Sequence, residues 1–136
     1  MTNILVVDEE RSIRQAIKFE LENEGFLVID VNNYSEAFSA YNAFKCNLVI
    51  SDISDENGNG KNILNTFKNV PFIALTSFPN SSLSQKTKSI LKDRYFEKPF
   101  PIKELISKVY EVLNSEYLFA DAVGIEKNSG AVIAKT

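Results

Sequence analysis

Short apolar runs alternate with helix-like segments along most of this chain, and this alternation restricts its fold more than any other feature. The runs are rich in Ile, Val, Leu and Phe and mostly lack polar alternation, as expected for strands buried on both faces of a sheet. They lie at Ile4–Val7, Phe26–Val31, Leu48–Ser51, Pro71–Leu75 and Tyr95–Phe96. Since parallel strands are joined by helical crossovers, we expect an α/β fold: a doubly wound, five-stranded parallel sheet with helices on both faces.

The segments between these runs have helical spacing. Ile13, Ile17 and Leu21 recur every four residues, which places them on one helix face, and Gly25 follows as a C-terminal cap. Asn33, with a glutamate three residues later, resembles the capping box that begins a helix. Further helices are expected at 60–68, at 82–92 and from Pro101 to about residue 114.

The expected sheet accounts for only part of the 136 residues. We expect one domain over residues 1–115, and a linker or C-terminal extension over 116–136 that could begin an effector domain. Within this extension, Val123–Glu126 and Ala131–Ala134 flank a turn-like Asn-Ser-Gly and favour a β-hairpin.

Composition excludes several kinds of chemistry. The chain has no histidine, which removes Ser-His, Cys-His and histidine-metal sites. Its single cysteine, Cys46, is best interpreted as a small buried apolar residue. A net charge of −3 gives no broad attraction to DNA or anionic membranes. The first apolar run is too short for a signal peptide and no stretch reaches membrane-spanning length, so we expect a cytoplasmic protein without a membrane partner.

Polar residues follow the expected strands at their carboxyl ends, where ligands bind in such sheets. Asp8 with two glutamates follows the first strand, Asp52 the third, Thr76 ends the fourth and Lys98 follows the fifth. Clustered carboxylates need a compensating cation, and oxygen ligands suit Mg²⁺. A carboxylate can also attack phosphorus, with a metal, a lysine and a hydroxyl group offsetting the charge on the phosphoryl oxygens.

In these segments the chain resembles the receiver domain of two-component response regulators. The matching stretches are ILVVDEE at 4–10, LVISD at 48–52, FIALTS at 72–77 and YFEKPF at 95–100. Each is short, but four in this order at the strand ends are specific. The resemblance covers about residues 2–115 and implies a flavodoxin-like sheet with strand order 2-1-3-4-5.

The resemblance also implies roles for individual residues. Asp52 would be the phosphoacceptor, with Thr76 bonding the phosphoryl group and Lys98 pairing with one of its oxygens. Mg²⁺ would be held by Asp8, Glu9, Asp52 and the backbone carbonyl of Ser54. Thr76 and Tyr95 would form the conformational switch, and the Lys98–Pro99 peptide bond would be cis.

Two departures from the family pattern concern the rate and lifetime of phosphorylation more than the chemistry. The family commonly has aspartate where Glu9 stands. The loop after Asp52 lacks the usual Met-Pro-Gly and instead carries two further acids, Asp55 and Glu56.

The leading hypothesis is a signalling switch rather than an enzyme. A partner histidine kinase would phosphorylate Asp52, and the added charge would change an output surface that includes the helix at 82–92, with control of transcription as the expected output. The last helices would mediate homodimerisation, and DNA would be bound only through an effector domain that this chain does not contain. A stand-alone receiver acting by protein contact is an alternative.

Two other classes of protein fit the sequence less well. An aspartyl-phosphate phosphohydrolase usually has a second acid two residues after its nucleophile, where this chain has Ser54. A flavodoxin-like nucleotide binder needs a Gly-, Ser- or Thr-rich phosphate loop after the first strand, where Asp8 and the acids that follow would repel phosphate.

Overall fold

Five parallel strands form a single sheet in the computed structural model, which describes residues 1–54, 59–77 and 83–122. The strands are β1 (Asn3–Val7), β2 (Leu27–Val31), β3 (Leu48–Asp52), β4 (Phe72–Thr76) and β5 (Tyr95–Glu97). Their order is β2-β1-β3-β4-β5, and every neighbouring pair is parallel. The predicted fold class and strand order are therefore confirmed.

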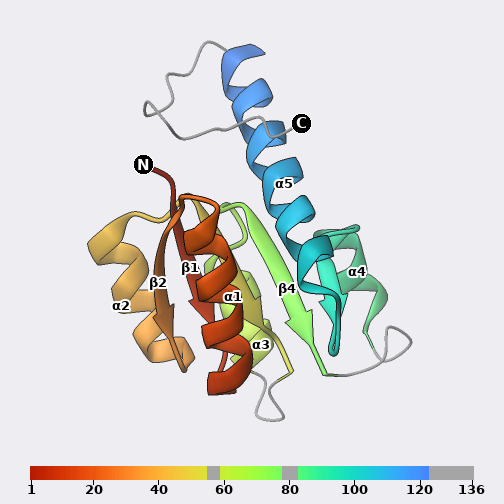
Figure 1. The fold of residues 1–136 in the computed structure, drawn as a ribbon. Coiled ribbons are helices and arrows are strands. Elements are labelled where there is room, and N and C mark those ends of the chain that lie inside the picture. Colours follow the sequence, from red (N-terminus) through yellow and green to blue (C-terminus); the bar gives the residue numbers. More distant parts are fainter. Residues whose placement is uncertain (55–58, 78–82, 123–136) are drawn as a thin grey trace.

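Helices cover both faces of this sheet (Figure 1). They are α1 (Arg11–Asn23), α2 (Tyr34–Phe44), α3 (Asn59–Thr66), α4 (Gln85–Leu91) and α5 (Ile102–Ala122). Alternate residues of β1 supply the two cores, because successive side chains of a strand point to opposite faces. Ile4 and Val6 pack with residues of α1 and α5, whereas Leu5 and Val7 pack with residues of α2 and α4.

Capping residues mark the start of α2 and the end of α1 at the expected positions. Asn33 Oδ1 accepts a hydrogen bond from the Glu36 N–H at 2.9 Å, which caps the start of α2. Gly25, directly after α1, has a φ of +97°, a backbone conformation that residues with a Cβ rarely adopt. Ser84 caps α4 by accepting a hydrogen bond from the Thr87 N–H, so within the described residues this helix is shorter than the expected 82–92.

Helix α5 differs most from expectation, because it continues past residue 115 to Ala122. Its first part is held by the core through Leu105, Val109 and Leu113, and Figure 1 shows its last turns rising beyond the edge of the sheet. The hairpin expected at 123–134 lies outside the described residues. In the described part of the chain, no helix is long and apolar enough to cross a membrane.

Candidate functional site

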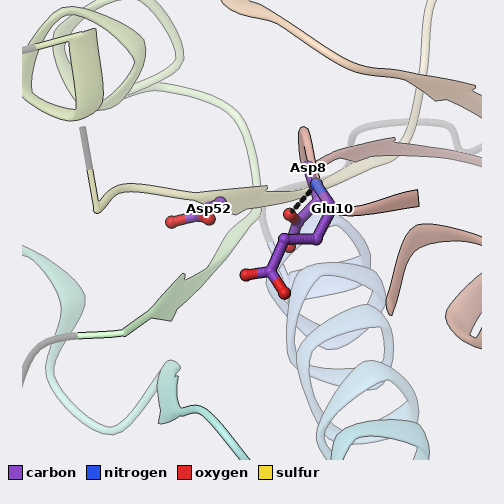
Figure 2. Close-up of side chains that lie close together, drawn as sticks. All are labelled: Asp8, Glu10 and Asp52. Atoms are coloured by element: carbon purple, nitrogen blue, oxygen red, sulfur yellow. Dashed lines mark hydrogen bonds between the residues drawn. The ribbon is translucent and has the colours of Figure 1, made fainter. Parts of the chain in front are cut away.

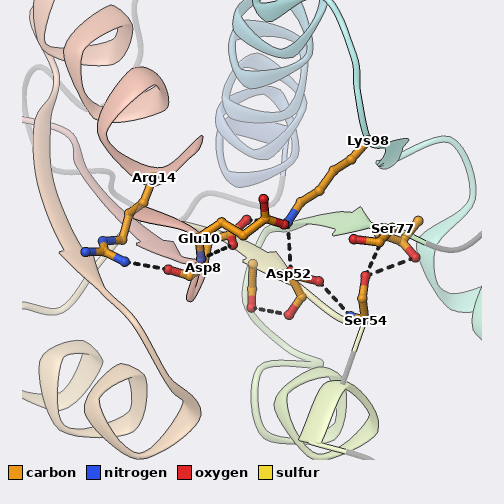
Figure 3. A network of polar contacts seen from close by, with 9 residues as sticks. Asp8, Glu10, Arg14, Asp52, Ser54, Ser77 and Lys98 are labelled. Carbon is orange, nitrogen blue, oxygen red and sulfur yellow. Dashed lines mark hydrogen bonds and ion pairs between the residues drawn. The ribbon is translucent and has the colours of Figure 1, made fainter. Parts of the chain in front are cut away.

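The carboxyl ends of the strands bring the predicted site residues together at one edge of the sheet (Figure 3). Asp8 comes one residue after β1, Asp52 is the last residue of β3, Thr76 is the last of β4, and Lys98 follows β5 directly. The parallel register explains this meeting, since Asp52 pairs with Leu75 and Thr76 with Glu97. The Lys98–Pro99 peptide bond is cis, as the resemblance implied.

Lys98 lies at the centre of the site. Its Nζ is 2.7 Å from Asp8 Oδ2, 2.8 Å from Asp52 Oδ2 and 3.1 Å from Glu10 Oε1. Burial would lower the pKa of this ammonium group, but hydrogen bonding and charge attraction from Asp52 and Asp8 raise it well above its ordinary value. Lys98 therefore stays charged, and one ammonium group balances three carboxylates.

Asp8 is the most buried of the charged site residues, with 1% of its surface exposed. Its Oδ1 accepts a hydrogen bond from the Glu10 N–H at 2.9 Å. Its Oδ2 forms the 2.7 Å ion pair with Lys98, but it shares this ammonium group with carboxylates of Asp52 and Glu10. Burial raises the pKa of Asp8, while Lys98 and the Glu10 N–H oppose that rise. The buried carboxylate is thus incompletely compensated.

These features fit a divalent cation. Carboxylate oxygens of Asp8, Glu10 and Asp52 lie within 4.8 Å of one another. Figure 2 shows the three side chains close together. The donor set consists of oxygen atoms, which Mg²⁺ prefers, and the one cation beside the buried Asp8 Oδ2 among the described residues, Lys98, is shared with two further carboxylates. The residues present therefore suit the metal that the resemblance implied.

The structure groups Glu10 with the two aspartates, whereas Glu9 is exposed and outside that group. Glu10 has an extended backbone, with φ of −78° and ψ of 104°. Alternate side chains of an extended chain point the same way, and Glu10 lies two residues after Asp8. This spacing is the sequence signal that would have pointed to Glu10, which was not among the predicted ligands. The assignment of Glu9 as a metal ligand stays a prediction.

Asp52 is held at both carboxylate oxygens. Oδ1 accepts a hydrogen bond from the Ser54 N–H at 2.7 Å, and Oδ2 accepts one from Lys98 Nζ. The side chain remains 17% exposed, compared with 0% for Asp8. Of these two aspartates, Asp52 is therefore the one that an incoming group can reach. The metal-binding role of the Ser54 carbonyl stays a prediction.

Ser54 also connects this carboxylate to the end of β4. Its hydroxyl oxygen accepts a hydrogen bond from the Ser77 N–H and lies 3.4 Å from Thr76 Oγ1 (Figure 3). Thr76 is fully buried, and its hydroxyl group lies beside the site. Tyr95 is half-buried at the start of β5 and packs against the core on the α2 and α4 side. Its role as a switch residue stays a prediction.

Comparison with known proteins agrees with this geometry. The family model of the response regulator receiver domain matches residues 4–110. The chain is 28% identical to the response regulator protein GraR of Staphylococcus epidermidis over 119 residues, covering 85% of this chain and 53% of GraR. It is 32% identical to the probable transcriptional regulator ycf27 of Porphyridium aerugineum, covering 81% and 47% of the two chains.

Solved structures of response regulators have the same fold as this chain. The response regulator protein TrrA of Thermotoga maritima, in complex with Mg(2+)-BeF, has a TM-score of 0.72 and 31% identity, with 83% of this chain and 100% of that chain covered. The chain therefore belongs to the receiver domain family of two-component response regulators. It spans about half the length of the curated relatives it matches.

Proposed function

We propose that Asp52 accepts a phosphoryl group from a partner histidine kinase, and that this modification switches the domain between two signalling states. The observation that carries the proposal is the 2.8 Å hydrogen bond between Lys98 Nζ and Asp52 Oδ2, beside the buried carboxylate of Asp8. A reachable carboxylate next to a fixed cation is the arrangement that an acyl phosphate requires.

Phosphoryl transfer to Asp52 would exchange one bond to phosphorus for another. An oxygen of Asp52 attacks the phosphorus of the kinase phosphohistidine, a P–O bond forms and the P–N bond breaks. The electron pair of the broken bond goes to the imidazole nitrogen of the kinase, which takes up a proton. Because this chain contains no histidine, the donor histidine lies outside it.

The residues around Asp52 would then stabilise the product. The phosphoryl group adds about −1.5 to −2 charge at neutral pH. Lys98 supplies a cation within reach, and Thr76 and Ser54 supply hydroxyl groups near the end of β4. Movement of Thr76 toward the phosphoryl group, with Tyr95 following, is the proposed switch.

Asp8 and Asp52, together with Glu9 or Glu10 and the Ser54 carbonyl, would hold Mg²⁺. When bound, Mg²⁺ neutralises charge on the phosphoryl oxygens during transfer. Without Mg²⁺, Lys98 neutralises part of the negative charge of the site, since its Nζ contacts carboxylates of Asp8, Glu10 and Asp52.

Acetyl phosphate labelling in the presence of Mg²⁺ tests the proposal, with intact-protein mass spectrometry as the readout. The wild-type chain should gain one phosphoryl group, and Asp52→Asn should gain none. Asp93→Asn makes the same change at a side chain that is 71% exposed and outside the site, and it should be labelled like wild type. Equal labelling of the Asp52 variant would overturn the assignment.

We propose that the domain is a phosphorylated switch and not a phosphatase that turns over external substrates. A phosphohydrolase needs an acid that protonates the leaving group, and Ser54 occupies the position two residues after Asp52. Steady release of phosphate from p-nitrophenyl phosphate, lost in Asp52→Asn, would support the phosphatase instead.

For the output, we propose control of transcription by a cytoplasmic protein. The support is that relatives are named transcriptional regulators, among them the phosphate regulon transcriptional regulatory protein PhoB of Klebsiella pneumoniae, 28% identical over 116 residues. DNA contact would come from an effector domain, and phosphorylation would favour dimers through the last helices. Light scattering before and after acetyl phosphate treatment tests dimerisation, and an unchanged mass would favour a stand-alone receiver acting by protein contact.

A further inference from the structure

Arg14, on the first turn of α1, has no part in the proposed chemistry but links two neighbouring strands at the edge of the sheet. Its Nη1 donates a hydrogen bond to the backbone carbonyl of Asp8 at 2.7 Å (Figure 3). Its Nε donates to Asp30 Oδ2 at 2.8 Å. The Arg14 side chain is 14% exposed and that of Asp30 17% exposed. One guanidinium group therefore links the end of β1 to β2.

This link completes a set of contacts that fix Asp8. The Asp8 N–H donates to the Val31 carbonyl at 3.1 Å, and Asp8 Oδ1 accepts from the Glu10 N–H at 2.9 Å. With Arg14 on the carbonyl, three of the four polar atoms of Asp8 have directed partners. The fourth atom, Oδ2, is thereby aimed at Lys98 and the carboxylate group.

Arg14 is itself held in place. Asp30 receives hydrogen bonds from Gln15 and Lys18 as well as from Arg14. Burial alone would raise the pKa of Asp30, but the hydrogen bonds from Arg14 and Lys18 lower it overall, so the carboxylate stays ionised at neutral pH. The Arg14 backbone N–H also donates to the Glu10 carbonyl at 3.0 Å. The guanidinium group therefore acts as a fixed support.

We infer that Arg14 is a positioning residue for the divalent cation site, acting through the backbone of Asp8 rather than by touching the metal. This inference rests on the proposed function, because it assumes that Asp8 binds the cation. Removing a group that hydrogen-bonds to a metal ligand, without touching the metal, commonly lowers metal affinity by about ten- to a hundredfold.

The sign of the effect separates positioning from simple charge. Removing a positive charge near the site, with no change in the position of Asp8, should tighten the binding of a cation. Loss of the hydrogen bond to the Asp8 carbonyl should instead let the peptide turn and weaken binding. Lys18 provides the matched control, because it contacts the same Asp30 at 3.1 Å but is not a partner of the Asp8 carbonyl.

The experiment is titration calorimetry of the unphosphorylated chain with MgCl₂, using wild type, Arg14→Gln, Arg14→Lys and Lys18→Gln. We expect Arg14→Gln to raise the Kd for Mg²⁺ by about tenfold. Lys18→Gln should leave the Kd unchanged or lower it. Arg14→Lys keeps the charge but can reach only one of the two acceptors well, so its Kd should lie between those of wild type and Arg14→Gln.

Circular dichroism before each titration selects temperatures at which every variant is folded, and Asp30→Asn provides a second route. That variant keeps Arg14 but weakens its anchor, so its Kd should rise less than that of Arg14→Gln. If wild type binds Mg²⁺ and Arg14→Gln binds as tightly or more tightly, the positioning role is wrong and the proposed function is untouched. If folded wild type binds no Mg²⁺, the proposed metal site itself fails.

Discussion

Lys98 and Asp52 are 46 residues apart in the chain, yet Lys98 Nζ donates a 2.8 Å hydrogen bond to Asp52 Oδ2. The parallel order β3-β4-β5 places the ends of their strands at the same edge, with β4 between them. The Lys98 side chain is only 7% exposed and also neutralises Asp8 and Glu10. The stability of the metal-free domain should therefore depend on this lysine.

Lys98→Met keeps the apolar part of the side chain and removes its charge. It leaves carboxylates of Asp8, Asp52 and Glu10 without their shared cation, and removing one partner of a buried ion pair costs about 3 kcal/mol. We expect the free energy of unfolding, measured in urea without metal, to fall by roughly that amount, and Mg²⁺ to restore part of it. Lys103→Met, at an exposed position of α5, should change neither value appreciably. A metal-free stability equal to that of wild type would contradict this account of Lys98.

Asp8→Asn should have the opposite effect on the metal-free domain. Asp8 is a buried carboxylate that shares the ammonium group of Lys98 with Asp52 and Glu10, so three carboxylates that repel one another have one cation between them, and Lys98 stays paired when Asp8 is replaced. An amide of the same shape removes that repulsion, so we expect the free energy of unfolding without metal to rise by about 1 kcal/mol. Stabilisation by Mg²⁺ should disappear at the same time. Urea unfolding with and without MgCl₂ measures both effects, and a variant that is destabilised without metal would show that Asp8 is better compensated than its contacts indicate.

Tyr110 ties α5 to the end of α1, because its hydroxyl group donates a 2.7 Å hydrogen bond to Glu24 Oε1. Its ring, 7% exposed, also contacts the ring of Phe26. Tyr110→Phe keeps the ring and loses the hydrogen bond. The free energy of unfolding at neutral pH should fall by about 1.5 kcal/mol, as for hydrogen bonds to charged groups. Tyr41→Phe, which changes a half-buried tyrosine of α2, is the matched control.

The same tyrosine gives a pH dependence with a defined sign. Burial, and then the neighbouring Glu24 carboxylate, raise the pKa of Tyr110 to about 12. The unfolded chain ionises near pH 10, so the contribution of Tyr110 is complete below about pH 10 and is lost as the pH rises toward 12. Urea unfolding at several alkaline pH values should show this loss in wild type and Tyr41→Phe but a smaller loss in Tyr110→Phe. If the free energy of unfolding fell equally with rising pH in all three proteins, this role of Tyr110 would be wrong.

Much of this fold is readable from short-range patterns in the sequence. The run Ile4–Val7 predicts a strand buried on both faces because every side chain in it is apolar, and its residues do enter both cores. The length of α5 was not readable in this way. Helical spacing marks the part that packs on the sheet, up to Leu113. The apolar residues that follow, Tyr117 to Ala120, were assigned to the C-terminal extension, although α5 continues through them.

The site was predictable to the extent that it depends on strand ends. Asp8, Asp52, Thr76 and Lys98 follow from parallel strands alone, and the structure brings them together. The choice between Glu9 and Glu10 depends on the backbone angles of the loop after β1, and the support from Arg14 depends on a side chain one helical turn further along. Such contacts between neighbouring elements are set by three-dimensional packing, and no single residue type predicts them.

The continuous helix α5 has a mechanical consequence. A helix rises about 1.5 Å per residue, so the segment from Leu113 to Ala122 extends roughly 13 Å past the last residue that the core holds. A rod clamped at one end converts a small rotation at the clamp into a larger displacement at its tip. Any change at the sheet edge that tilts the packed turns of α5 by a few degrees would therefore be magnified at Ala122, and whatever is attached there would receive the signal as movement.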